Sequence, residues 1–195
     1  MAYFCVGARW QDGLPSTAPH EPVFAHLVLR GLDTCRVSPS NAQHLIVCAG
    51  VAAALELCYP DHRVLGEREL RRDERESGVP VASALMGVGP DGRQKLHVPD
   101  LVLRRKGSQE LPVAVEVELT TKAPRRLAEI CGAWARCRVV AGVLYLAPAE
   151  VARALERAIE RARASERVVV VPLDALPWCG DLAGASRQST VSSDA

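Results

Sequence analysis

Two glutamates within one apolar stretch are the residues of this sequence best suited to chemistry. Residues 112–121 read PVAVEVELTT, and the alternating valines predict a strand. Since the side chains of a strand alternate between its two faces, Glu116 and Glu118 share one face. Neighbouring carboxylates repel each other and resist burial unless a cation neutralises them. Mg²⁺, a hard ion that prefers oxygen ligands, is the simplest such cation.

A third acid and a lysine extend this pair. Asp100 lies in the run HVPD at 97–100, and it would approach the glutamates if the strands around 95–104 and 112–121 pair as a hairpin. Lys122 follows Glu118 by four residues. A divalent ion in this set would polarise a phosphate and activate a water, while the lysine offsets negative charge. We therefore predict Mg²⁺ as cofactor, bound by Asp100 and Glu116, with Glu118 as a second ligand or as the base for the attacking water. Lys122 is predicted to stabilise the phosphate, so all four residues are candidate catalytic residues.

The same residues also allow plainer interpretations. An E-x-E pattern arises wherever one face of a strand meets water, and an isolated aspartate such as Asp100 is typical of a turn. A small-molecule hydrolase that uses the same acids is a further alternative, although no motif marks a substrate pocket. His44, inside an apolar helix, is interpreted as a histidine at the edge of the core.

These acids carry a resemblance to a known superfamily. A P-D pair ending at Asp100, then fifteen residues, then E-V-E at 116–118 resemble the core of the PD-(D/E)XK nucleases. In that superfamily a helix precedes the catalytic strands and often contributes another glutamate, and Glu56 occupies that place as a further metal ligand. A strict motif has lysine where this chain has Glu118, and Lys122 stands in a shifted position.

A larger part of the chain, from about 41 to 173, resembles the actinobacterial plasmid replication-relaxation family. The matching stretches are HL at 44–45, RVLGERELR at 63–71, HVPD at 97–100, AVEVELTTK at 114–122, RRL at 125–127 and GVLYL at 142–146. The resemblance implies action on DNA in plasmid or mobile-element replication, with plasmid replication or transfer proteins as partners. Members usually carry an N-terminal winged helix, and we expect none within the proline-rich residues 1–40.

Basic residues follow the candidate catalytic strand. Residues 122–138 hold five cations and one acid, which suits a polyanionic backbone. We predict that Arg125 and Arg126 bind nucleic acid, together with His97 beside the P-D pair. The alternative is an ordinary solvated helix face.

The elements that must position these residues follow a mixed α/β order. Apolar spacing predicts helices over 41–58, 124–137 and 149–164, and strands over 62–71, 95–104, 112–121, 139–147 and 167–173. The first helix is apolar almost all round and is expected to be largely buried, and the last two strands are expected inside the sheet. We predict an α/β domain over 41–176, with a single mixed central sheet flanked by helices. The resemblance implies that this domain is a PD-(D/E)XK (restriction-endonuclease-like) core. An extended lead-in (1–40) precedes it and a flexible tail (177–195) follows.

Composition limits the class of protein. The 195 residues carry a net charge of +1, which excludes a polycationic coat but allows a local basic patch. Seven cysteines include no C-x-x-C pair and are interpreted as structural thiols. The longest apolar run, at 45–55, is shorter than the roughly 18 residues of a membrane span, and no signal-peptide pattern is present. We therefore predict a cytoplasmic protein without a membrane partner.

The sequence thus predicts Mg²⁺-dependent phosphodiester hydrolysis or nicking of DNA. The alternative from another functional class is a non-catalytic DNA-binding or partner-binding accessory that retains the nuclease-like fold.

Overall fold

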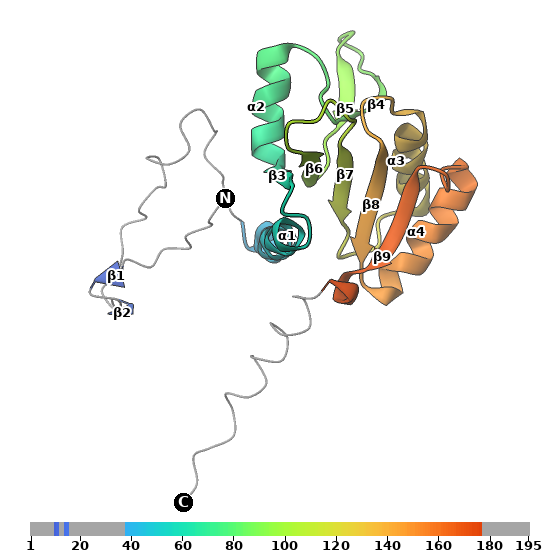
Figure 1. Ribbon diagram of the computed structural model, residues 1–195. Helices are drawn as coiled ribbons and strands as arrows, with labels where there is room; N and C mark the ends of the chain where they lie inside the picture. The colour runs from blue at the N-terminus through green and yellow to red at the C-terminus, as the bar shows by residue number, and fades with distance from the viewer. Residues whose placement is uncertain (1–9, 12–13, 16–37, 177–195) are drawn as a thin grey trace, which may run out of the picture.

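A five-stranded sheet positions the candidate site residues. The computed structural model describes residues 10–11, 14–15 and 38–176, and the sheet has the order β3-β6-β7-β8-β9 (Figure 1). β6 pairs antiparallel with β3 and β7, whereas β7, β8 and β9 are parallel. The predicted α/β class with a mixed central sheet is confirmed. The strands are His62–Gly66 (β3), Leu101–Arg105 (β6), Val113–Val117 (β7), Gly142–Ala147 (β8) and Val168–Pro172 (β9).

Helices cover the two faces of the sheet and bury both sides of β7. On one face, α1 (Pro39–Cys58) packs Val51 and Leu55 into a cluster with Val115. On the other face, α3 (Pro124–Arg136) and α4 (Ala149–Ala162) form a second cluster that includes Ala114. By the alternation of a strand, Glu116 takes the face of Ala114 and therefore projects toward the side of α3.

A helix and a hairpin precede β6 in the chain. Helix α2 (Glu67–Ser77) follows β3 directly, and β4 (Ala84–Val88) pairs with β5 (Gln94–His97) in a separate two-stranded sheet. The predicted strand over 62–71 is therefore wrong beyond Gly66. Glu69 accepts the Gly66 N–H at 3.1 Å, so a capping contact starts a helix where apolar spacing indicated a strand.

The predicted strand over 95–104 is divided between β5 and β6. Pro99 has no N–H for a ladder, so β5 ends before it, and the carbonyl of Asp100 accepts the N–H of Glu67 at 3.1 Å, which continues the β3–β6 pairing by one residue. This break sets Asp100 at the entrance to β6, beside the start of α2.

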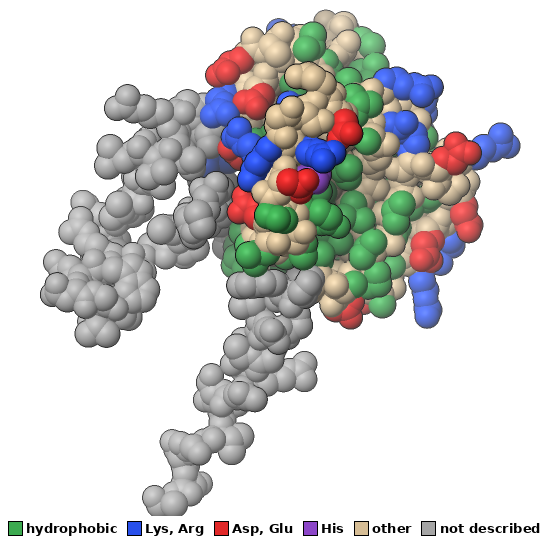
Figure 2. All heavy atoms as spheres, viewed as in Figure 1, with side chains coloured by type: hydrophobic (Ala, Val, Ile, Leu, Met, Phe, Trp, Pro, Cys, Tyr) green, Lys and Arg blue, Asp and Glu red, His purple; other side chains and the backbone are tan. Residues whose placement is uncertain are grey.

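Helix α1 is less buried than predicted. Ile46 and Leu57 are 65% and 61% exposed, and Figure 2 shows hydrophobic side chains at the surface around α1. The helix lies across one face of the sheet, so only its inner side is covered. By length and composition, residues Asn41–Cys58 could cross a membrane, which the apolar run at 45–55 did not predict. Val51 and Leu55 pack against the sheet, but only 22% of this stretch is buried.

The two last strands differ in position. β8 lies between β7 and β9 as predicted, but β9 is at the edge of the described sheet, and Val169 is exposed. An apolar run indicates that side chains of the strand are buried, but it does not determine where the strand lies in the sheet. The position of β9 depends on the crossover through α4, which connects it to β8. The predicted lead-in and tail lie outside the described residues, except that Trp10–Gln11 (β1) pairs with Leu14–Pro15 (β2) and that α1 begins at Pro39.

Candidate functional site

Asp100 joins three elements at one end of the sheet. Its Oδ2 accepts the backbone N–H of Val117 at 2.8 Å, and its Oδ1 lies 2.9 Å from Nε2 of His44 on α1. Val117 stands between Glu116 and Glu118, so the Asp100 carboxylate contacts the amide that separates the two glutamates. The antiparallel pairing of β6 with β7, expected from the sequence, produces this contact.

Glu116 is a buried acid in contact with a histidine. Its Oε1 lies 2.7 Å from Nε2 of His97, whose ring packs edge-on against Trp134 of α3. Burial raises the pKa of Glu116, His97 opposes this rise, and the negative charge of Asp100 adds to it. Glu116 is therefore held at the edge of the core, where its ionisation depends on its neighbours.

Glu118 is buried as well and pairs with a lysine. Nζ of Lys122 donates to Oε2 of Glu118, and the Lys122 side chain is about half exposed. The N–H of Glu118 donates to the carbonyl of Leu146 at 2.9 Å, which continues the β7–β8 pairing by one residue. Lys122 thus neutralises a buried carboxylate from the solvent side.

The three predicted acids lie at the same end of β7, but each has a partner of its own. The pairs are Asp100 with His44, Glu116 with His97, and Glu118 with Lys122. The structure therefore shows three paired carboxylates rather than one shared set of ligand oxygens.

A different set of ligand atoms comes together beside them. Within the part of the chain that the structure describes, the three potential metal-ligating atoms within 4.8 Å of one another belong to His44, Cys48 and Asp100. Glu56, predicted as a ligand, lies twelve residues beyond His44 on the same helix. At 1.5 Å per residue that separation is about 18 Å, so the structure does not bring Glu56 to the site.

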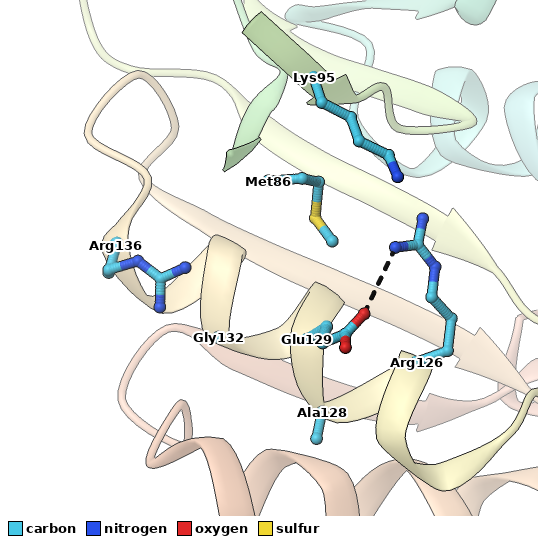
Figure 3. A pocket seen from close by; sticks show the side chains of 7 residues that line it. All are labelled: Met86, Lys95, Arg126, Ala128, Glu129, Gly132 and Arg136. Atoms are coloured by element: carbon cyan, nitrogen blue, oxygen red, sulfur yellow. Dashed lines mark ion pairs between the residues drawn. The ribbon is translucent and has the colours of Figure 1, made fainter. Parts of the chain in front are cut away.

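A basic groove lies between the β4–β5 hairpin and α3. It encloses about 450 Å³, and Figure 3 shows Lys95 extending from the hairpin toward Arg126, which pairs with Glu129. Its cations outnumber its one acid, so the groove favours an anion. The lining residues are Met86, Lys95, Arg126, Ala128, Glu129, Gly132 and Arg136.

Strand β5 connects this groove to the acids. Lys95 and His97 are two residues apart on β5, so their side chains leave the same face, about 7 Å apart along the strand. Lys95 lines the groove and His97 contacts Glu116. Arg125, also predicted to bind nucleic acid, is outside the groove, where its side chain is 92% exposed and pairs with Glu129 at 3.1 Å.

Sequence reasoning missed Cys48 and Lys95, and it gave His44 a structural role only. The signal for His44 and Cys48 was their spacing, because residues four apart on a helix lie on one face. Lys95 gave no such signal, since the β4–β5 hairpin that carries it was not predicted.

Comparison of the chain with protein-family models, with curated proteins and with solved structures finds no match in any of the three. The resemblance to the replication-relaxation family therefore remains an expectation based on its motifs. What the chain does is to be inferred from its own residues and contacts.

Proposed function

We propose that this chain binds DNA along the groove between β5 and α3 and hydrolyses a phosphodiester bond with Mg²⁺, as a PD-(D/E)XK-like protein of the replication-relaxation type. The main support is the arrangement on β5, where Lys95 lines a basic groove and His97 contacts a buried acid. A backbone lying in the groove would have a phosphate near the carboxylates at the end of β7.

The carboxylates of Asp100, Glu116 and Glu118 would hold the magnesium ion. Mg²⁺ prefers such oxygen ligands, and it would have to replace the separate partners that the three acids have in the structure. A nearby cation would favour ionisation of Glu116, whose pKa burial raises. A bound Mg²⁺ would supply polarisation of the phosphate and a water of lowered pKa.

The other residues of the site would act on the substrate or on these acids. Lys95 and Arg126 would bind phosphates in the groove, and the exposed Arg125 would extend that contact. Lys122, exposed on one side of Glu118, would offset negative charge that develops on the phosphate. His97 would orient the Glu116 carboxylate through its 2.7 Å contact.

Nicking of a supercoiled plasmid tests this proposal. Wild-type protein should nick with Mg²⁺ and not with EDTA, and Asp100→Ala and Glu116→Ala should each reduce the rate about 100-fold or more. Glu156→Ala, which removes an exposed acid from α4, is the matched control and should nick at the wild-type rate. Absence of cleavage by a folded wild-type protein contradicts hydrolysis, and equal cleavage by all variants indicates a contaminating nuclease.

The second candidate is the non-catalytic accessory. Its specific support is that each acid already has a cationic or imidazole partner within the chain, which a purely structural cluster also requires. This function predicts salt-dependent DNA binding that neither EDTA nor Glu116→Ala changes, without nicking.

A further inference from the structure

We propose that His44, Cys48 and Asp100 form a binding site for a transition-metal ion of the zinc type. Nε2 of His44 lies 2.9 Å from Oδ1 of Asp100 and 3.4 Å from Sγ of Cys48, and all three atoms lie within 4.8 Å of one another. An imidazole nitrogen, a thiol sulfur and a carboxylate oxygen are the three kinds of ligand that Zn²⁺ takes in proteins.

The separations of the His44 nitrogen from its two neighbours are close to those around a tetrahedral ion, and the sulfur and the oxygen lie within 4.8 Å of each other. Ligand atoms bound to Zn²⁺ at about 2.0–2.3 Å are separated from one another by roughly 3.3–3.8 Å. The 3.4 Å separation of sulfur and nitrogen is within that range, and the 2.9 Å separation of nitrogen and oxygen is a few tenths of an ångström below it. An ion would therefore replace the His44–Asp100 hydrogen bond with only a small movement of side chains.

The elements that carry the ligands hold them in place before an ion arrives. His44 and Cys48 are one helical turn apart on α1, and α1 is fixed to the sheet by Val51 and Leu55. Asp100 is oriented by the Val117 N–H, which bonds to Oδ2 and leaves Oδ1 toward His44. Cys48 is buried while His44 and Asp100 are partly exposed, so a fourth position can face water.

The charges around Cys48 favour a cation. The carboxylates of Asp100, Glu116 and Glu67 are close enough to act on its thiol, and a divalent ion bound to the sulfur would displace its proton. Sulfur and imidazole ligands select Zn²⁺ or Co²⁺ over Mg²⁺, which prefers oxygen alone. The site therefore differs in metal preference from the magnesium site, although both include Asp100.

Cobalt titration of the full chain tests the site. Protein freed of metal with a chelator is titrated with Co²⁺ in the absence of Mg²⁺, and its near-ultraviolet absorption is recorded at each addition. The wild type should develop a thiolate-to-cobalt charge-transfer band that saturates at about one equivalent and disappears when Zn²⁺ is added. Cys48→Ser should abolish the band, and His44→Gln and Asp100→Asn should each weaken cobalt binding at least tenfold.

Cys58→Ser is the matched control, because it removes an exposed thiol from the same helix and leaves the three ligands in place. It should keep the wild-type band and affinity. The proposed site is wrong if the Cys48→Ser variant keeps the band, if Cys58→Ser removes it, or if the wild type shows no band.

Circular dichroism of each variant checks that it is folded. If the Cys48→Ser variant does not fold, the other two ligand variants decide the question. Unchanged cobalt affinity in folded His44→Gln and Asp100→Asn would then overturn the site. The titration measures metal binding without any DNA. Failure of the proposed metal site can therefore be distinguished from failure of the proposed nicking activity.

Discussion

Nε2 of His97 lies 2.7 Å from Oε1 of Glu116, and the two side chains are only 18% and 9% exposed. An acid and an imidazole are thus in contact at the end of β7, and the imidazole is two residues along β5 from Lys95 of the basic groove. Because burial opposes ionisation of Glu116 while His97 favours it, this pair couples the protonation of the site to the stability of the fold.

Glu116→Gln should reduce the dependence of stability on pH. Since the pKa of Glu116 is raised in the folded chain, the folded state retains a proton that the unfolded state loses above the ordinary value of about 4.5. The contribution of this group to stability therefore decreases as pH rises from that value through the raised pKa. Urea unfolding at a series of pH values above 4.5 should show this decrease in the wild type and a flatter curve in the variant, which keeps an acceptor oxygen for His97.

The exposed Glu156→Gln provides the comparison for this measurement and should follow the wild-type curve. Parallel curves for wild type and Glu116→Gln would show that Glu116 ionises in the fold as it does in the unfolded chain.

Asp100→Asn should lower the pKa of His44. The hydrogen bond to Asp100 raises this pKa above 6.5 although burial opposes it, so the stability that the pair contributes is complete below pH 6.5 and is lost as pH rises through the raised value. NMR titration of the His44 ring in chelator-treated protein measures the midpoint directly. Asp61→Asn, which removes the acid beside His62 instead, should leave the His44 midpoint unchanged. Equal His44 midpoints in wild type and Asp100→Asn would contradict the assignment.

Local patterns predicted most of the fold because most of its elements bury one regular set of side chains. The spacing of Leu127, Ile130 and Trp134 predicted α3, and all three residues are buried in the structure. The apolar pattern failed at Glu67, because a capping contact starts helix α2 there. It also failed for β9, because the edge position of that strand depends on the crossover and not on its valines. The exposed side of α1 was missed for the same reason, since composition does not show how many neighbours a helix has.

The acids of the site were predictable, and so were His97 and Lys122 as their neighbours, but the contact of Asp100 with His44 was not. Glu116 and Glu118 share a strand, so their relationship is local, whereas His44 and Asp100 are 56 residues apart. Their contact depends on how α1 is rotated on the sheet and on the break at Pro99, neither of which a periodic pattern specifies. The same limitation hid the H-x-x-x-C pair on α1, because its third ligand comes from another element.

Removal of Lys122 should destabilise the fold through Glu118. Lys122→Met leaves the buried Glu118 carboxylate without its cation. In a Glu118→Gln background the same change leaves no buried charge unpaired, so it should cost less stability. A double-mutant cycle by urea unfolding should give a coupling energy of about 1 kcal/mol, at the lower part of the usual range because Lys122 is half exposed.

The pair Glu67–Arg71 has the same four-residue spacing but is exposed on both sides, and it is the natural reference. Its coupling energy should be about 0.3–0.5 kcal/mol. A Glu118–Lys122 coupling no larger than this would mean that burial of Glu118 does not strengthen the pair.

Lys95→Ala and Arg126→Ala should weaken DNA binding by a similar factor for every sequence tested. Each cation lines the groove and would neutralise one phosphate, so each substitution should reduce the slope of log affinity against log salt concentration by about one, and the double variant by about two. Fluorescence anisotropy with a labelled duplex at several salt concentrations measures the slopes. Arg157→Ala removes an exposed cation from α4, and its slope should equal that of the wild type. If Arg157→Ala reduced the slope as much as the groove variants do, DNA would be bound by the charge of the whole surface and not by the groove. The proposal that the groove places a phosphate near Glu116 would then be wrong.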